Sequence, residues 1–379
     1  MDIQQLRGWW NLATRLTRRP PVAQTPSDVV HAENKWRLLR YRPRAGGPGL
    51  RTPVLLVPSL INRYYVLDLA PGRSMVEYLV AQGHDTFVLD WGTPGDEDRE
   101  LGFDDFCDRY LARAIRVASG FSEREQVHLV GYCLGGTFAA IHAAVHPENI
   151  ASITAVAAPI RFHDDGLLSR FARTRSFDAE ALVEAFGNVP WPLMQATFQM
   201  LRPTATAAKI VSLWDRAAND DFIDGFAAVE AWSNDAVSFP GRCFVEYIEG
   251  LYRADGLVNR TFQLSGQPVH LDAIRCPTLA ITVENDHIVP WQSAAELVER
   301  VGTPDRERIH LRGGHVGAVV SKAGAANLWP KLSAWWAARD EVVAASQQKP
   351  PSEPEPRPAR KVRRKRRSGG APHVENAIT

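Results

Sequence analysis

The feature that most constrains the fold is a cysteine flanked by glycines, placed between a short apolar run and a helical pattern. Residues 127–130 (Val-His-Leu-Val) lead into Gly131-Tyr-Cys133-Leu-Gly135, and a helical pattern covers residues 136–144. Glycines two positions before and after Cys133 allow a sharp turn from strand to helix, because side chains there would collide. The turn places Cys133 at a helix N-terminus, whose partial positive charge favours a thiolate. The segment therefore predicts a nucleophilic thiol on a strand-turn-helix unit.

Short apolar runs alternate with helical patterns over residues 35–159, and the alternation resumes after residue 272. The predicted strands cover residues 54–57, 85–89, 127–130, 153–156, 278–283 and 308–311. The predicted helices cover residues 74–81, 103–118, 136–144, 293–301 and 325–338. Strands separated by helices at this spacing predict an α/β fold with a mostly parallel sheet and helices on both faces.

The segment between the two alternating parts has a different character. Residues 160–272 are helical and rich in aromatic side chains, without the strand-helix alternation. We interpret the chain as one α/β core, residues 31–159 and 273–340, interrupted by a helical cap over residues 160–272. Residues 1–30 are predicted to form an amphipathic helix and a linker, and residues 341–379 a disordered tail.

Charge is unevenly distributed along the chain. Lys and Arg number 44 against 43 Asp and Glu, but residues 341–379 alone carry nine basic and four acidic side chains, a net +5. This Pro-, Ser- and Arg-rich tail has almost no apolar residues to bury. Its basic cluster is compatible with binding to nucleic acid, with binding to an acidic partner, or with a solvated tail that binds nothing. We favour the solvated tail.

The cysteine content and the apolar runs indicate in which cellular compartment the protein works. Four cysteines in 379 residues are too few for a disulfide framework, which indicates a reducing environment. No apolar run approaches the ~18 residues of a membrane span, and the first residues lack the apolar core of a secretory signal. We therefore expect a cytoplasmic protein.

The strand-turn-helix around Cys133 has the pattern of the nucleophile elbow of α/β-hydrolases, with cysteine in place of serine. In that fold the acid and the histidine follow the nucleophile in chain order, on loops after late strands. Asp286 follows the predicted strand 278–283, and the glycine-flanked His315 follows strand 308–311. These loops and the elbow lie at the same edge of a parallel sheet. The sequence therefore predicts a Cys133–His315–Asp286 triad.

Other residues compete for these roles. His287 adjoins Asp286 but should point away from it, and Asp90, at the end of a strand, is the main rival to Asp286 as the acid. Structural roles are expected for the remaining candidate histidines, His128, His142, His146 and His310. The other cysteines, Cys107, Cys243 and Cys276, are expected to pack as small apolar side chains.

An acyl-transfer site also needs two donors for an oxyanion. One should be the backbone N–H of Leu134, directly after the nucleophile. The second should come from the loop after strand 54–57, and we assign it to the N–H of Ile61, with Leu60 next to it as the alternative. The sequence contains no zinc-type Cys/His spacing and no phosphate-binding glycine loop, so we expect neither a metal nor a nucleotide cofactor.

Several segments together resemble the polyhydroxyalkanoate synthases of the α/β-hydrolase superfamily. They are VPSLINRYYVLDLAPGRSMVEYLVAQGHDTFVLDWGTP, GYCLGG, LSGQPVHLDAIRCPTLAITVENDHIVPW and GGHVGAVVS. The chain length and the segment HPENIASITAVAAPIRF are most similar to the short class III or class IV enzymes. The resemblance covers about residues 30–340 and leaves out the basic tail.

The resemblance implies polymerisation of (R)-3-hydroxyacyl-CoA, chiefly 3-hydroxybutyryl-CoA, into a polyester through an acyl-cysteine, with release of CoA. It also implies a small accessory subunit, a homodimer and a location at the surface of polyester granules. The first twenty residues would then dock on that subunit or on the granule, or form a loosely attached helix. Two other functions stay open: a cysteine hydrolase or polyester depolymerase that uses the same triad on water, and a non-catalytic granule-coating protein.

Overall fold

The computed structural model of the chain describes residues 20–43, 49–122, 124–201, 203 and 205–347. The amphipathic helix expected at the start of the chain and the basic cluster of the tail lie outside the described residues. Within the part that is described, no helix is long and apolar enough to cross a membrane.

Eight strands form one sheet in the order β1-β2-β4-β3-β5-β6-β9-β10. Strands β3, β4, β5, β6, β9 and β10 run parallel to one another, whereas β2 is antiparallel to both β1 and β4. The strands are β1 (Ser27–Glu33), β2 (Trp36–Tyr41), β3 (Val54–Val57), β4 (Thr86–Asp90), β5 (Val127–Tyr132), β6 (Ile150–Val156), β9 (Thr278–Val283) and β10 (Arg306–Leu311). The predicted α/β-hydrolase fold with a mostly parallel sheet is confirmed.

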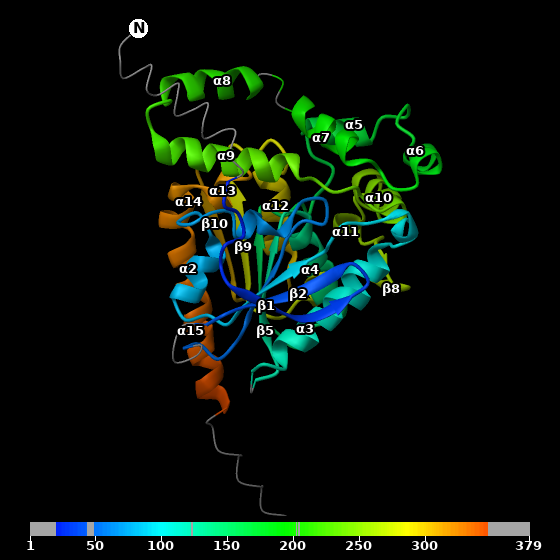
Figure 1. Cartoon of the computed structure of the whole chain (residues 1–379). Coiled ribbons are helices and arrows are strands. Elements are labelled where there is room, and N and C mark those ends of the chain that lie inside the picture. The colour runs from blue at the N-terminus through cyan, green and yellow to red at the C-terminus, as the bar shows by residue number, and fades with distance from the viewer. Residues whose placement is uncertain (1–19, 44–48, 123, 202, 204, 348–379) are drawn as a thin grey trace, which may run out of the picture.

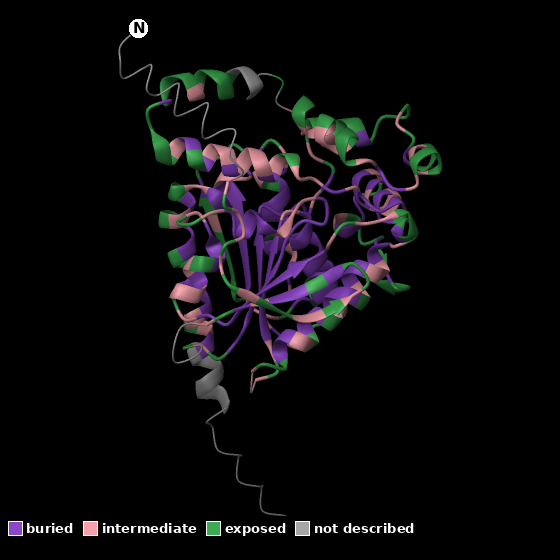
Figure 2. Ribbon diagram, in the orientation of Figure 1, coloured by how far each residue is buried: buried purple, intermediate pink, exposed green. Residues whose placement is uncertain are grey.

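Helices cover both faces of the sheet, and each face has its own apolar core. On one face, α3, α4 and α12 bury Leu111, Phe138 and Leu297. On the other, α2 and α15 bury Leu79 and Trp336. The helices are α2 (Met75–Ala81), α3 (Leu111–Ser119), α4 (Leu134–Val145), α12 (Trp291–Arg300), α13 (Gly317–Val320), α14 (Lys322–Asn327) and α15 (Trp329–Gln347). Figure 2 shows the middle of the sheet as the buried centre of the molecule, because β3, β4, β5 and β9 are buried along their whole length.

The structure differs from the sequence prediction in four places. Helix α15 continues to Gln347, so residues 341–347 are helical where the sequence predicts a disordered tail. Strand β1 begins at Ser27, inside the segment predicted to be a linker, and pairs with β2 as an antiparallel edge hairpin. The helix predicted over residues 325–338 is two helices, because Pro330 fits only the first turn of α15 and ends the continuity with α14. The helix predicted over 103–118 begins as a π-helix, Asp104–Tyr110, and continues as α3.

The described chain between β6 and β9 forms helices, as the sequence predicts, and adds a short hairpin of β7 (Gln263–Leu264) and β8 (Gln267–Pro268). Figure 1 shows α8 and α9 lying across the top of the molecule, with α5, α6 and α7 beside them. These helices are α5 (Leu167–Ala172), α6 (Ala179–Phe186), α7 (Trp191–Met200), α8 (Ala205–Asp215), α9 (Asp220–Asn234), α10 (Gly241–Glu246) and α11 (Gly256–Asn259). We call this group of helices the cap.

Candidate active site

Cys133 sits at the turn between β5 and α4, as predicted. Its backbone has φ +54° and ψ −130°, a left-handed conformation that non-glycine residues rarely adopt. The Cys133 N–H donates to the Val156 carbonyl at 2.9 Å, and the Gly136 N–H donates to the Cys133 carbonyl at 2.9 Å. These bonds hold the strained turn, and the side chain stays partly exposed at the N-terminus of α4.

The glycines around Cys133 are required by close backbone contacts. A Cβ on Gly131 would lie 2.3 Å from the Cα of Gly136, and a Cβ on Gly135 would lie 2.1 Å from the Val57 carbonyl oxygen. Real Cβ atoms do not approach backbone atoms this closely. The glycine spacing seen in the sequence therefore lets α4 pack directly against β3 and β5, which brings Cys133 to the carboxyl edge of the sheet.

Asp286 and His315 form a buried pair beside this edge. The His315 Nδ1–H donates to Asp286 Oδ2 at 2.6 Å, and the two side chains are 7% and 0% exposed. The other carboxylate oxygen, Oδ1, accepts the backbone N–H groups of Ile288 at 2.9 Å and Val289 at 2.8 Å. Both oxygens of Asp286 are thus engaged, and they hold His315 in one orientation.

The electrostatics of His315 fit a proton acceptor for the thiol. Burial alone would lower its pKa, but the charges of the Cys133 thiolate and Asp286, with hydrogen bonds to both side chains, raise the pKa to about 10. The ring of Tyr132 lies against the His315 ring at a centroid distance of 5.2 Å. His315 therefore holds a proton firmly once Cys133 has become a thiolate.

The two predicted oxyanion donors lie close to the sulfur. Leu134 is the first residue of α4, where backbone N–H groups have no acceptor within the helix. Ile61 is buried in the loop after β3 and lines both cavities that reach Cys133. This placement keeps both donors as candidates.

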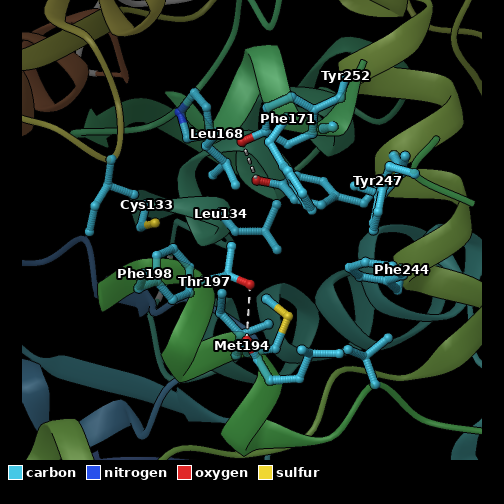
Figure 3. Close-up of a pocket in the computed structure, with 18 of the residues that line it drawn as sticks. Cys133, Leu134, Leu168, Phe171, Met194, Thr197, Phe198, Phe244, Tyr247 and Tyr252 are labelled. Atoms are coloured by element: carbon cyan, nitrogen blue, oxygen red, sulfur yellow. Dashed lines mark hydrogen bonds between the residues drawn. The ribbon is translucent and has the colours of Figure 1, made fainter. Parts of the chain in front are cut away.

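Two cavities meet at Cys133. The first, which we call the apolar cavity, has a volume of about 220 Å³ and runs under α5, α6, α7 and α10. Apart from Cys133, only Thr197, Tyr247 and Tyr252 bring polar side-chain atoms to it. Figure 3 shows Cys133 at one side of this cavity, with aromatic and aliphatic side chains of the cap around the rest.

The second cavity, which we call the polar cavity, has a volume of about 290 Å³. It lies under α7 and α9, and His315 lines it but does not line the apolar cavity. Its other polar side chains are Asn62, Tyr132, Gln195, Gln199, Lys209, Glu230, Trp232, Ser233, Asn234 and His287, and apolar side chains such as Leu201 and Ile288 complete its lining. Met194 and Phe198 of α7 border both cavities, as do Ile61 and Ile288, so these side chains lie where the two cavities meet beside Cys133.

The rival residues have other partners. Asp90 binds Arg37 at 2.5 Å, and His287 is exposed on the rim of the polar cavity. The remaining histidines bind structural partners: His128 with Ser152, His142 with the Cys107 carbonyl, His146 with Asp108 and His310 with Thr282.

The other cysteines and the acidic groups add no second site. Cys107 and Cys243 are fully buried in the core, and burial raises the pKa of Cys276 to about 11, as expected for packing residues. Among the described residues, no group of three or more His, Cys, Asp or Glu side chains is arranged to hold a metal ion.

The residues of the cap that line the cavities were not identified from the sequence. The aromatic-rich composition of residues 160–272 is visible there, but not which side chains face Cys133. Helical periodicity identifies an apolar face without saying what that face covers. The relevant residues are Leu168, Phe171, Leu193, Met194, Phe198, Phe244, Tyr247 and Tyr252.

Comparisons with known proteins agree with this geometry. Residues 52–320 match the family described as alpha/beta hydrolase fold, and residues 17–79 match the N-terminus of poly-beta-hydroxybutyrate polymerase. The chain is 34% identical over 85% of its length to the poly(3-hydroxyalkanoate) polymerase subunit PhaC of Haloferax mediterranei, of which it spans 65%. It is 32% identical over 82% of its length to the Allochromatium vinosum subunit of the same name, of which it spans 88%.

Solved structures show similarity at the level of the fold. A monoglyceride lipase from Saccharomyces cerevisiae has a TM-score of 0.55 and 11% identity, covering 84% of this chain and 96% of the lipase. Identity this low supports the shared architecture alone.

Proposed function

Because the chain belongs to the poly(3-hydroxyalkanoate) polymerase family, we propose that it polymerises (R)-3-hydroxyacyl-CoA, chiefly 3-hydroxybutyryl-CoA, with release of CoA. The observation that carries the proposal is a strained cysteine at a helix N-terminus, beside a buried His315–Asp286 pair, where an apolar and a polar cavity meet. The thioester is the substrate, and the chemistry needs no cofactor.

In the first step His315 takes the proton of Cys133, and the sulfur attacks the thioester carbonyl of the substrate. The N–H groups of Leu134 and Ile61 stabilise the negative oxygen of the tetrahedral intermediate. The C–S bond to CoA then breaks, the proton on His315 passes to the leaving thiolate, and an acyl-cysteine remains.

In the second step the hydroxyl of another hydroxyacyl unit attacks the acyl-cysteine. His315 takes the hydroxyl proton, a C–O ester bond forms, the C–S bond to Cys133 breaks, and the proton passes to the Cys133 sulfur. The lengthened chain is then a CoA thioester, and Cys133 attacks it as in the first step, so that CoA leaves and the chain is again attached to Cys133. Asp286 lines neither cavity, and both of its oxygens are engaged. This supports Asp286 as the group that orients His315 and not as a direct base for the hydroxyl.

A thiol nucleophile suits this reaction, because exchange between two thioesters is nearly isoenergetic and keeps the acyl group activated. Transfer to a hydroxyl must also exceed hydrolysis, which requires exclusion of water. The apolar side chains of the cap over Cys133 supply such an environment.

The proposal is tested by Cys133→Ala and Cys133→Ser. We expect Cys133→Ala to abolish both CoA release and polymer formation, and Cys133→Ser to leave only traces, since a serine hydroxyl lacks thiolate reactivity. Polymer formation by Cys133→Ala at a near-normal rate would refute the proposal.

A hydrolase that transfers the same acyl group to water is the second candidate, because the hydrogen-bonded His315–Asp286 pair beside Cys133 can also activate water. Free 3-hydroxybutyrate as the main product, in place of insoluble polymer, would favour it. A non-catalytic granule-coating protein is opposed by the hydrogen-bonded His315–Asp286 pair next to Cys133.

We further propose that the protein acts in the cytoplasm at the granule surface, as a homodimer with a small accessory subunit. Copurification from polymer-producing cells tests the partners, and deletion of residues 1–20 tests whether the N-terminus contributes. The basic tail is proposed to be dispensable for catalysis, so truncation after Gln347 should leave CoA release unchanged. Salt-sensitive DNA binding that the truncation removes would reveal a nucleic-acid role for the tail.

A further inference from the structure

We propose that the apolar cavity binds the growing polyester chain attached to Cys133 and leads it to an exposed apolar surface of the cap. The proposal rests on the polymerase function proposed above and assigns a ligand to each of the two cavities. The incoming CoA thioester then occupies the polar cavity.

The assignment follows from where His315 lies. In each tetrahedral intermediate at Cys133, the leaving thiol or the attacking hydroxyl must exchange a proton with His315. His315 lines only the polar cavity, so those groups lie on that side. The oxyanion points to the backbone N–H groups, and the remaining substituent of the carbonyl, the acyl chain, is directed to the apolar cavity.

The chemistry of the apolar cavity fits the chain and not CoA. Its few polar side-chain atoms are engaged within the protein: Thr197 Oγ1 donates to the Leu193 carbonyl, and the hydroxyls of Tyr247 and Tyr252 contact each other at 3.5 Å. Phosphate charges would be buried there without partners, at a large free-energy cost. An aliphatic polyester carries no charge and no donor except its terminal hydroxyl.

The cavity is large enough and it reaches the surface. An apolar cavity of ~150 Å³ accommodates benzene, which is about the size of one 3-hydroxybutyryl unit. A cavity of about 220 Å³ therefore holds one unit and part of the next. Two lining residues, Phe171 and Leu193, are also 43% and 41% exposed at the outside of the cap.

At the outer end of the cavity, α5 and α7 present further apolar side chains to solvent. Leu167 is 57% exposed and directly precedes Leu168, which lines the cavity. Trp191 is 40% exposed and lies two residues before Leu193, which also lines it. We call Leu167, Phe171, Trp191 and Leu193 the apolar cap surface. Exposed apolar side chains at the mouth of an apolar cavity mark a binding surface. The continuity of this surface with the cavity identifies its ligand as the same apolar chain.

The test substitution is Leu193→Glu, which places a charge at the mouth of the apolar cavity on an exposed helix position. The matched control is Ile210→Glu on α8, because Ile210 is 62% exposed and lines neither cavity. The first acylation is measured as the burst of CoA released per Cys133, and elongation as the steady rate of CoA release and the molar mass of the polymer.

We expect Leu193→Glu to keep the burst within about twofold of the unsubstituted protein and to lower elongation and polymer mass at least fivefold, while Ile210→Glu changes neither. Equal losses of burst and elongation would overturn the proposal, because the cavity would then serve the incoming thioester. No loss of elongation would also overturn it. So would a change from dimer to monomer in sedimentation with Leu193→Glu alone, since the surface would then be a protein interface. Failure of the proposed function has a different signature: the unsubstituted protein would yield free acid instead of polymer.

A separate set of hydrogen bonds carries a second inference, that Asp235 is a positioning residue for the loop containing Ile61. Asp235, at the C-terminal end of α9, accepts from Arg63 Nε at 3.0 Å and from the Tyr65 hydroxyl at 2.7 Å. The indole N–H of Trp232, on the last turn of α9, donates to the Arg63 carbonyl at 2.9 Å.

These bonds join the cap to the segment that follows Ile61. Because the oxyanion donor assigned to Ile61 lies two residues before Arg63, we infer that seating of α9 determines where this N–H points. The inference rests on the proposed acylation of Cys133. It makes the donor depend on the cap being closed over the site.

The chain offers a matched control at the other end of the same helix. Asp221, in the first turn of α9, binds Arg73 at 3.1 Å and Lys322 at 2.9 Å and has no contact with the loop of residues 61–65 among the described interactions. Asp221→Asn therefore weakens exposed ion pairs at the start of α9 and leaves the end of the helix seated on the loop by Asp235 and Trp232, whereas Asp235→Asn weakens that seating.

Two reactions of Cys133 separate positioning from a general effect on the cap. Acylation by 3-hydroxybutyryl-CoA forms an oxyanion, whereas alkylation by iodoacetamide displaces iodide and forms none. We expect Asp235→Asn to slow single-turnover acylation about tenfold with alkylation unchanged, Asp235→Glu to recover part of the rate, and Asp221→Asn to affect neither reaction. Equal slowing of both reactions, or equal effects of the two Asn variants, would refute the inference. A protein whose unsubstituted Cys133 accepts no acyl group would instead refute the proposed function.

Discussion

Replacing Asp286 by Asn tests the orientation of His315 with little change in shape. The Asn side-chain oxygen keeps the hydrogen bonds from Ile288 and Val289, so the loop should stay folded. Its NH₂ group, however, faces His315 Nδ1, which must then act as the acceptor. The proton of the neutral ring moves to Nε2, and this nitrogen loses the lone pair that accepts a proton from Cys133.

The size of the effect follows from this change of tautomer. The corresponding Asn substitution in a serine-protease triad lowers the rate about 10⁴-fold, or roughly 5–6 kcal/mol of transition-state stabilisation. The Asp286–His315 bond is 2.6 Å long and fully buried, so solvent does not replace it. Asn also removes a negative charge that raises the pKa of His315. We therefore expect a loss of 10³- to 10⁴-fold.

Rapid-quench measurement of acylation and elongation gives the decisive comparison. We expect both steps to fall together in Asp286→Asn, because His315 serves both. Asp90→Asn is the control, since Asp90 binds Arg37 away from the cavities and its loss should leave both steps intact. Normal acylation with failed elongation would show that Asp286 acts on the hydroxyl directly, and the reasoning from its occupied oxygens would be wrong.

Three further predictions concern the base, the stability and the turn. His315→Gln should block acylation of Cys133 with labelled substrate, whereas His287→Gln, on the exposed rim, should retain it. Burial lowers the pKa of His84 and His142 to about 4, so the unfolded chain takes up protons first as the pH falls below about 6.5. Stability is therefore full above that pH and decreases toward pH 4, by on the order of 3 kcal/mol for each histidine, which thermal unfolding across this range measures. Gly135→Ala should destabilise the protein by more than ~3 kcal/mol, because its Cβ would lie 2.1 Å from the Val57 oxygen; a melting temperature equal to that of the unsubstituted protein would contradict this.

The elements that carry the catalytic side chains were predictable because their signals are local. Strand β9 spans the predicted residues 278–283, and its six side chains are all buried. Cys133, Asp286 and His315 each follow a strand of the parallel part of the sheet, and the carboxyl ends of such strands share one edge. Chain order and strand direction therefore suffice to bring the pair of His315 and Asp286 to Cys133.

Other elements depend on contacts that a single sequence does not display. Strand β1 has intermediate and exposed side chains, so it lacks the apolar alternation that marks a strand, and it depends on pairing with β2 and on packing of Val30 against the core. The clamp of Asp235 on Arg63 and Tyr65 joins residues 170 or more positions apart. Nothing in the spacing of these polar residues indicates that they meet.

The strain at Cys133 connects the fold to the proposed chemistry. A non-glycine residue with φ +54° costs on the order of 1–3 kcal/mol, and it persists only where the surroundings determine it. Here the surroundings are the packed glycines on either side of Cys133 and the two backbone hydrogen bonds at the turn. If the turn relaxed, the Cys133 sulfur would move away from the N-terminus of α4 and from His315. It would also leave the point where the two cavities meet. The same strained geometry thus gives Cys133 its base and gives the acyl group and its acceptor separate places to lie.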